Sequence, residues 1–124
     1  MAESVTVERL ESHVCGAWTE GDGEGRPLHN PTTGEVVATT TTADVNYAAC
    51  LAYARDTGGP ALRAMTFAER GQLLQGMADA LHGVRDELIG IAITNGGNTR
   101  GDAKFDIDGA MFTLAHYAKL AEDL

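Results

Sequence analysis

The side chains in this chain that offer the strongest nucleophilic chemistry are two thiols. Cys15 lies between a valine and a glycine in a segment of extended character, and Cys50 lies in an alanine-rich helical segment. A catalytic thiolate needs a pKa lowered by a positive neighbour, a metal ion or a helix start, and neither segment supplies one. The spacing also fits no metal-binding pattern. We therefore expect both cysteines to be structural and to stay reduced.

The histidines and the acidic loop residues show no spacing typical of a metal or catalytic site. The four histidines fall on separate predicted elements: His13, His29, His82 and His116. They lack the close pairing of a metal-binding helix and any evident Ser-His-Asp arrangement. Asp22 and Glu24 provide too few ligands for a calcium loop. The sequence therefore predicts no metal site, and it predicts surface or turn positions for the histidines.

Two features near residue 100 have the residue types of a binding or acid–base site. Residues 95–102 (NGGNTRGD) are the candidate for a glycine-rich phosphate cradle. They follow a predicted helix rather than a buried strand, so a helix cap and loop is the simpler interpretation. Asp102, Asp106 and Asp108 have the composition of an acidic site, but capping of a helix amino end explains Asp106 and Asp108 more simply. We therefore predict no catalytic and no cofactor-binding residue.

Length and charge restrict the possible functions further. A chain of 124 residues has room for one modest core, not for a nucleotide-binding domain together with a catalytic domain. The net charge of −9, with nine scattered basic residues, argues against nucleic acid and anionic membranes as partners. The first residues lack the basic and apolar regions of a secretory signal, and no apolar run is long enough to span a bilayer. A cytoplasmic location is expected.

The amino-terminal third has the signals of strands and tight turns. Residues 14–18 and 26–28 are extended runs on either side of the glycine loop at residues 21–25, which predicts a β-hairpin. In the next turn, NPTTGE, Pro31 fixes its own φ and Gly34 supplies the positive φ that closes the reversal. A strand is predicted to follow, because valines and threonines dominate the residues after the turn.

The remainder reads as three or four helices. Asp44 is a suitable N-cap for a first helix that ends at Gly58-Gly59-Pro60. Thr66 and Glu69 form a capping box at the start of a long helix that ends before Asn95. A final helix, Asp106 to Leu120, has Asp106 and Asp108 at its positive end. Apolar residues recur at three- and four-residue spacing on both longer helices: Phe67, Leu74, Met77, Leu81, Val84, Leu88 and Ile91 on one, and Met111, Leu114, Ala118 and Ala121 on the other.

The predicted long helix also contains a stripe of glycines. Gly76, Gly83 and Gly90 are seven residues apart and share one helix face. Each costs about 1 kcal/mol relative to alanine in a helix interior. The stripe is either a tolerated weakness, which we favour, or a groove that lets another backbone approach. A stripe that faces solvent predicts that Gly83→Ala stabilises the fold.

Several segments in order resemble the amino-terminal part of one enzyme family. They are HNPTTGEVV at residue 29, GGPALRAMTFAER at residue 58, LLQGMADAL at residue 73 and NGGNTRGDAKFDIDGAMFTLAHYAKL at residue 95. The first is typical of the aldehyde dehydrogenase superfamily in general. The second and the last resemble aldehyde dehydrogenases that act on CoA-bound semialdehydes in aerobic aromatic degradation. The bifunctional oxepin-CoA hydrolase and semialdehyde dehydrogenase of phenylacetate catabolism is the most similar member, and the benzoate-pathway enzyme is a near second.

The resemblance implies oxidation of an aldehyde to an acid with NAD or NADP, through a thiohemiacetal on a catalytic cysteine and with a glutamate base. Those residues belong to later segments of the longer family members, so none is assigned here and no cofactor is expected on this chain alone. The resemblance also implies that the last helix approaches the substrate entrance. Residues Asp106–Tyr117 are therefore a candidate wall of the substrate tunnel.

The sequence thus predicts an α+β fold, with an amino-terminal β-hairpin followed by three or four helices, as in the amino-terminal segment of an aldehyde dehydrogenase. Residues 1–124 would form a single partial domain, with a β-hairpin region at 10–43 and a helical region at 44–124. The predicted function is that of a segment that is not catalytically competent alone and whose partner is the remainder of the enzyme or a second copy. The alternative is a stand-alone interaction or oligomerisation module without catalysis.

Overall fold

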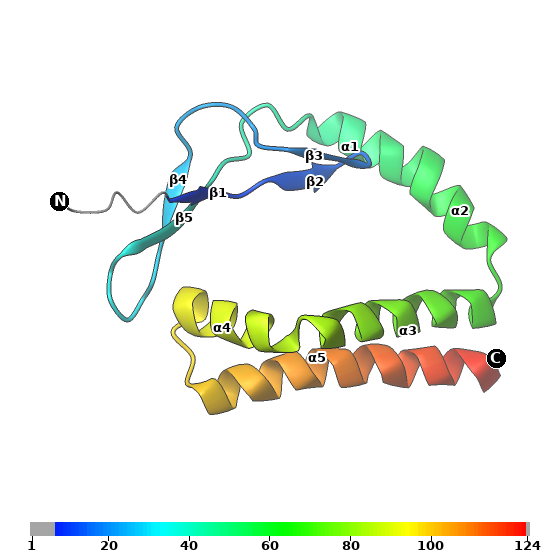
Figure 1. Cartoon of the computed structure of the whole chain (residues 1–124). Helices are drawn as coiled ribbons and strands as arrows, with labels where there is room; N and C mark the ends of the chain where they lie inside the picture. The colour runs from blue at the N-terminus through cyan, green and yellow to red at the C-terminus, as the bar shows by residue number, and fades with distance from the viewer. Residues whose placement is uncertain (1–6, 124) are drawn as a thin grey trace.

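The computed structural model describes residues 7–123, and it confirms the α+β class with strands first and helices after them (Figure 1). The strands are β1 (Glu8–Arg9), β2 (Ser12–Val14), β3 (Ala17–Thr19), β4 (Arg26–His29) and β5 (Val36–Thr40). The helices are α1 (Tyr47–Tyr53), the π turn η1 (Ala54–Gly58), α2 (Gly59–Ala64), α3 (Phe67–Gly83), α4 (Arg85–Gly96), α5 (Arg100–Leu120) and the 3₁₀ turn η2 (Ala121–Asp123). Elements β1 to α2 form a curved segment, here called the amino-terminal arm, above the α3–α5 layer in Figure 1.

The predicted turn at residues 30–35 is confirmed. It joins β4 to β5, which pair antiparallel, and β5 is the central strand because β1 lies parallel on its other edge. The Asn30 N–H donates to the Glu35 carbonyl and the Gly34 N–H donates to the Asn30 carbonyl, both at 2.8 Å. Gly34 has a φ of 77°, the left-handed conformation that its lack of a Cβ permits.

The predicted hairpin around the 21–25 loop is wrong. Strand β3 pairs with β2, whereas β4 belongs to the other sheet, so the loop connects two sheets. The reason is local: Cys15 and Gly16 have φ values of 51° and 83° and already form a two-residue turn. That turn places Val14 opposite Ala17, so β3 is already paired with β2 before the glycine loop begins.

The first helix differs from its prediction at both ends. Asn46 is the N-cap, since its side-chain oxygen accepts the Ala49 N–H at 2.9 Å, while Asp44 lies in the preceding turn with a φ of 65°. The helical path also continues through the Gly-Gly-Pro sequence to Ala64. A π turn, in which the Gly59 N–H donates to a carbonyl five residues earlier, interrupts the regular hydrogen-bond pattern just before the proline that lacks an N–H.

The capping box at Thr66 is confirmed, but the long helix that it starts is broken. The Thr66 hydroxyl accepts the Glu69 N–H at 3.2 Å, and the Glu69 carboxylate accepts the Thr66 N–H at 2.7 Å. Val84, with φ −116° and ψ 18°, separates α3 from α4. The break follows a glycine, the weakest helix former after proline. The helix is predicted to end before Asn95, but it continues to Gly96, where Gly97, with a φ of 69°, caps α4.

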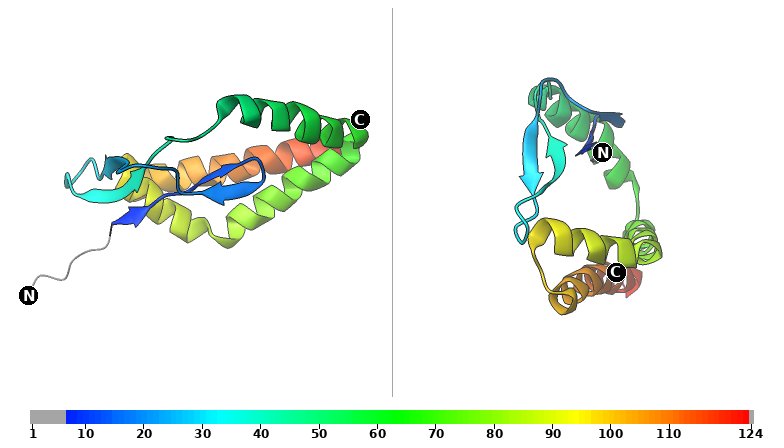
Figure 2. Two further views of the ribbon diagram at one scale, coloured as in Figure 1. Left: turned by 90° about the horizontal axis from the view of Figure 1, so that it is seen from above. Right: turned by 60° about the vertical axis from the view of Figure 1, so that its left-hand side comes forward.

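Helix α5 begins six residues before its prediction. Thr99 is the N-cap, because its hydroxyl accepts the Asp102 N–H at 3.2 Å. The placement of Asp106 and Asp108 at the amino end is therefore wrong, since both lie beyond the first turn. The predicted inner face is confirmed, with Met111 and Ala118 buried. Figures 1 and 2 show α5 running alongside α3 and α4.

The core of the described residues is small. Its buried apolar residues are Ala38, Ala78, Ile89, Ala103, Met111 and Ala118, four of which are alanines. The predicted apolar face of α3 and α4 is largely uncovered: Phe67, Met77 and Ile91 are each more than half exposed. The helices meet through small side chains instead, which lets their backbones approach but buries little area. Among residues 7–123, no helix is long and apolar enough to cross a membrane.

Candidate functional site

The two cysteines lie together, which the sequence did not indicate. Cys15 is in the β2–β3 turn rather than in a strand, whereas Cys50 is in the middle of α1, as expected from the sequence. Their sulfurs are 3.8 Å apart. Partial shielding from water, followed by the contact with Cys50, raises the pKa of the Cys15 thiol. A raised pKa is the opposite of what an activated nucleophile needs.

The histidines lie apart and on the surface, as predicted. All four are exposed and fall on β2, β4, α3 and α5. The His13 ring meets the Trp18 ring edge-on at 4.9 Å, and His116 meets Tyr117 in the same way at 5.4 Å. His29 Nδ1 lies 3.1 Å from the Gly34 carbonyl oxygen. Over residues 7–123, no group of three or more His, Cys, Asp or Glu side chains is arranged to hold a metal ion.

In the glycine loop at residues 21–25, Asp22, considered as a calcium ligand, contacts protein groups instead. The Thr41 hydroxyl donates to the Asp22 carbonyl at 3.1 Å. A hydrogen bond between the carboxyl groups, and the charge on Asp22, raise the pKa of Asp44. The carboxyl groups of Asp22 and Asp44 therefore lie near each other, with the glycine loop beside the residues that lead into α1.

The three aspartates proposed as an acidic site each have a different partner. The Asp102 carboxylate accepts the Thr99 hydroxyl at 2.7 Å, and the Asp106 carboxylate accepts the Asn98 amide at 3.3 Å. Asp108 accepts Nε and Nη2 of Arg85 at 2.6 and 2.8 Å. This bidentate pair joins the start of α4 to α5 and lowers the pKa of Asp108. The aspartates therefore form contacts of the fold rather than one catalytic group.

The glycine-rich segment 95–102 does not fit a dinucleotide. It connects two helices, with Gly97 ending α4 and Thr99 starting α5, and no strand precedes it. The amino end of α5 already has the Asp102 carboxylate in its first turn, where a phosphate would have to bind. Gly97 also packs on the 30–35 turn: a Cβ added there would lie 2.8 Å from Pro31. The residues described here thus provide no cradle for NAD or NADP.

The predicted tunnel-wall segment, Asp106–Tyr117, contributes to an uncovered aromatic surface together with Phe105, which lies just outside the predicted bounds. Phe105 and Phe112 are seven residues apart on one face of α5, and 79% and 73% of their surfaces are exposed. Both border a shallow hollow of about 360 Å³ together with Lys104 and Asp108. Among the described residues, two ionisable side chains border this hollow: Asp108, which is held by Arg85, and Lys104. This surface, here called the α5 aromatic face, is suited to contact and not to chemistry.

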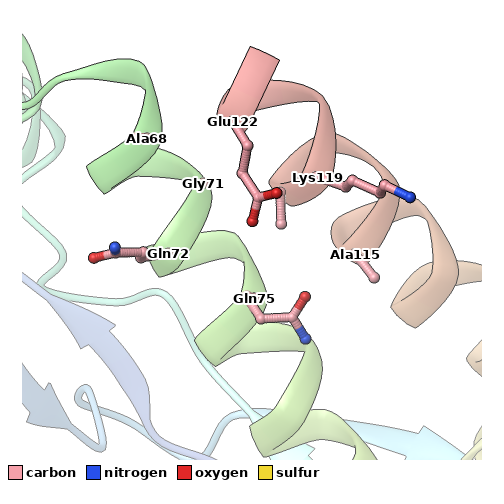
Figure 3. A pocket seen from close by; sticks show the side chains of 8 residues that line it. Ala68, Gly71, Gln72, Gln75, Ala115, Lys119 and Glu122 are labelled. Carbon is pink, nitrogen blue, oxygen red and sulfur yellow. The ribbon is translucent and has the colours of Figure 1, made fainter. Parts of the chain in front are cut away.

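A second hollow lies where α3 meets the end of α5. Gln75 and Glu122 point toward the space between the helices, whereas Lys119 points away from it (Figure 3). At Gly71 the helices approach closely, since an added Cβ would lie 2.8 Å from the Ala118 carbonyl oxygen. The hollow is therefore the flank of a packing seam. A sequence signal existed for the seam, because Gly71 and Ala78 are small residues spaced seven apart.

The glycine stripe of the sequence prediction is not part of that seam. A Cβ added at Gly76, Gly83 or Gly90 would meet nothing within 4 Å among the described residues. Within residues 7–123, no backbone of another element approaches the stripe, so tolerated weakness is the interpretation that the structure favours. Because space around Gly83 is open, Gly83→Ala is expected to stabilise the chain.

Comparison with known proteins identifies the family to which these elements belong. The model of the aldehyde dehydrogenase family matches residues 18–124. The chain belongs to the aldehyde dehydrogenase family. Over 116 residues it is 41% identical to the 3,4-dehydroadipyl-CoA semialdehyde dehydrogenase of Aromatoleum evansii, a match that covers 94% of this chain and 22% of that protein. It is 28% identical to the glutarate-semialdehyde dehydrogenase of Pseudomonas aeruginosa over 115 residues, 92% of this chain and 24% of that protein.

The coverage fits the absence of chemistry in the described residues. This member of the aldehyde dehydrogenase family spans less than a quarter of the length of both curated relatives. Its described part contains strands, helices and packing seams, and none of the constellations considered above forms a reactive centre. The resemblance to aldehyde dehydrogenases that the sequence indicated is confirmed for the family, and one relative is a CoA-semialdehyde dehydrogenase.

Proposed function

We propose that this chain forms the amino-terminal segment of an NAD(P)-dependent dehydrogenase that oxidises a CoA-linked semialdehyde in aromatic-compound degradation in the cytoplasm, and that it is not catalytically competent alone. Support for the substrate class comes from the relative at 41% identity, whose name specifies a CoA-linked semialdehyde. Its name also makes 3,4-dehydroadipyl-CoA semialdehyde the first substrate to test. The second relative acts on a semialdehyde without CoA, at lower identity.

The observation that supports a function only in association with further protein is the large exposed surface of this chain. A folded monomer of 13.1 kDa is expected to expose roughly 6,400 Å². This chain exposes 9221 Å², an excess of more than about 2,000 Å², comparable with what one partner buries in a large obligate interface. The uncovered area includes large apolar side chains such as Phe105 and Phe112. Such surface favours association with a partner.

The proposed partner is the remainder of the dehydrogenase, which would supply the nucleophile, the base and the cofactor-binding strands. In that arrangement the chain would contribute packing surface and no reactive groups. The α5 aromatic face would lie against the substrate-entrance side, where Phe105 and Phe112 exclude water from a passing acyl chain. The pair between Arg85 and Asp108 would hold this face in position, because it fixes α5 against α4 at the same level of the helix.

The alternative is a stand-alone interaction or oligomerisation module that uses the same uncovered surface without any catalysis. The two proposals predict different behaviour in solution. A segment of an enzyme should be weakly stable and should aggregate or bind the remaining part of a dehydrogenase. A module should form a well-defined dimer or a tight complex of its own, since burial of the α5 aromatic face would then occur between copies.

A reconstitution experiment tests the proposal. The Aromatoleum relative is produced without the region that matches this chain and is mixed with the purified chain. Reduction of NAD or NADP is then followed with 3,4-dehydroadipyl-CoA semialdehyde. We expect neither part to turn over alone and the mixture to gain activity, and we expect Phe112→Glu to abolish this gain while Phe67→Glu, on α3, provides a matched aromatic control. Turnover by the chain alone would refute the proposal, and a stable homodimer that never complements would favour the module.

A further inference from the structure

Two separate contacts fix the β2–β3 turn on helix α1. The sulfurs of Cys15 and Cys50, which are 35 residues apart in the sequence, lie 3.8 Å from each other. Beside them, a Cβ added at Gly16 would lie 3.0 Å from the Tyr53 hydroxyl oxygen. Cys50 and Tyr53 are three residues apart and therefore share one face of α1. The turn therefore approaches this face of α1 at two neighbouring points, Cys15 to Cys50 and Gly16 to Tyr53.

Cys15 occupies a backbone conformation that is unfavourable for cysteine. The two residues of the turn both have positive φ, 51° at Cys15 and 83° at Gly16. Asn-Gly and Gly-Gly are the preferred sequences for such a turn, because most side chains are strained in the left-handed region. A strained residue at a special position motivates a search for its function. The side-chain contact of Cys15 that the structure shows is with the sulfur of Cys50.

We propose that Cys15 and Cys50 form a reversible dithiol–disulfide pair, which closes to an intramolecular disulfide when the chain meets a small-molecule disulfide such as oxidised glutathione. In the reduced state the sulfurs are about 1.7 Å farther apart than in a disulfide bond. An adjustment of this size is within the reach of side-chain rotation and a small movement of the turn. The inference goes beyond the proposed dehydrogenase function and does not depend on it.

The reaction is a double thiol–disulfide exchange. Cys15, the more exposed of the two, loses its proton and attacks one sulfur of glutathione disulfide, whose S–S bond breaks and releases one glutathione thiolate. Cys50 then loses its proton and attacks the Cys15 sulfur of the mixed disulfide, which expels the second glutathione. Both cysteine thiols are oxidised to one disulfide, one glutathione disulfide is reduced to two glutathione thiols, and the two protons end on those thiols. Because only the thiolate attacks, the first step becomes faster as the pH rises, and the raised pKa of Cys15 moves this increase to higher pH.

The disulfide would stabilise a part of the chain that has little packing of its own. Helix α1, the η1 turn and α2 contain no buried residue. A bond between Cys15 and Cys50 would connect α1 to the small sheet and restrict the unfolded chain over the 35 residues between them. We expect the oxidised chain to have a thermal midpoint higher than that of the reduced chain by roughly 5–15 °C.

The test uses the intact chain in glutathione buffers of increasing oxidised-to-reduced ratio, at low protein concentration. Free thiols are blocked with an alkylating reagent, and intact mass and peptide maps are recorded without reduction. The expected product is a monomer that has lost two hydrogen atoms and gives one linked peptide pair containing both cysteines. A reducing agent should restore the starting mass and the lower thermal midpoint.

Single substitutions distinguish the pair from independent thiols. In Cys50→Ser, we expect the glutathione adduct on Cys15 to accumulate, because the second exchange is not possible, and we expect no rise in the thermal midpoint. Cys15→Ser should slow the reaction at Cys50, which is the less exposed sulfur. The proposal would be overturned if the oxidised wild-type chain carried separate glutathione adducts on both cysteines, or if its disulfides joined different molecules.

Discussion

The close approach of α3 and α5 at Gly71 predicts opposite effects for the same substitution at two glycines of one helix. A Cβ added at Gly71 would lie 2.8 Å from the Ala118 carbonyl oxygen and 2.9 Å from the Ala121 Cβ. Both distances are well below ordinary van der Waals contact, and the first obstacle is backbone, so α5 would have to move. A Cβ added at Gly76 would meet nothing within 4 Å. Both positions are helical, which makes Gly76→Ala the matched control.

The magnitude follows from two opposing terms. Replacement of glycine by alanine inside a helix stabilises by about 1 kcal/mol. Overpacking of a close contact costs about 1–3 kcal/mol. We therefore expect Gly76→Ala to stabilise the chain by about 1 kcal/mol and Gly71→Ala to destabilise it by up to about 2 kcal/mol. The two variants should differ in thermal midpoint by roughly 4–15 °C.

Thermal unfolding of the reduced chain, followed by far-UV circular dichroism, measures this difference. Urea unfolding of the same variants provides the free energies and shows whether the transition stays cooperative. The reasoning would be refuted if Gly71→Ala melted at or above the temperature of Gly76→Ala. That result would mean that α5 does not rest on the backbone of α3 at this position.

Further substitutions and a pH titration test other contacts. Thr66→Ala removes the acceptor of the Glu69 N–H and should lower the free energy of unfolding by about 1 kcal/mol in urea titrations. Hydrogen bonds with Arg85 lower the pKa of Asp108 below its ordinary 3.8, and bonds with Thr66 lower that of Glu69 below 4.5. The two carboxylates therefore stabilise the fold fully above those ordinary pKa values, and this stabilisation is lost as the pH falls through the lower pKa values of the folded state. Asp108→Asn should weaken the dependence of the thermal midpoint on acid pH. An unchanged dependence in this variant would contradict the role given to Asp108. Cys15→Asn should raise the thermal midpoint of the reduced chain, since asparagine tolerates the positive φ at this turn position.

Local signals in the sequence were sufficient for the elements that local chemistry determines. The turn around Pro31 and Gly34 and the capping box at Thr66 occur as predicted, because each depends on backbone preferences within a few residues. The end of α4 at Gly96 lies close to its predicted place before Asn95. The segments shared with aldehyde dehydrogenases also led to the correct family.

The wrong predictions arose where tertiary contacts select among local alternatives. Asp44 is a good cap by type, but its carboxyl contacts Asp22 and Asn46 caps the helix instead. Asp108 reads as a helix-end acid, yet its partner Arg85 is 23 residues away in the sequence. Apolar spacing located the inner face of α5 correctly but not that of α3, where Gly71 allows a close approach that hydrophobicity does not reveal.

The sequence predicted no candidate site, and it did not indicate the one pairing of thiol side chains that the structure shows. Residue types and spacing indicated no nucleophile, metal site or dinucleotide cradle. The pairing of Cys15 with Cys50 could not be found from spacing, because 35 residues and two different elements separate them. It depends on the position of a tight turn on a helix, which is a property of the folded chain.

The most direct test of the central claim is a turnover measurement on the purified 124-residue chain. The chain is incubated with 3,4-dehydroadipyl-CoA semialdehyde and either NAD or NADP, and absorbance of the reduced nicotinamide is followed, with calorimetric titration of each cofactor in parallel. The account predicts neither turnover nor cofactor binding by the chain alone, and activity only after the missing part of a dehydrogenase is added. Substrate-dependent production of NADH or NADPH by the isolated chain would contradict it.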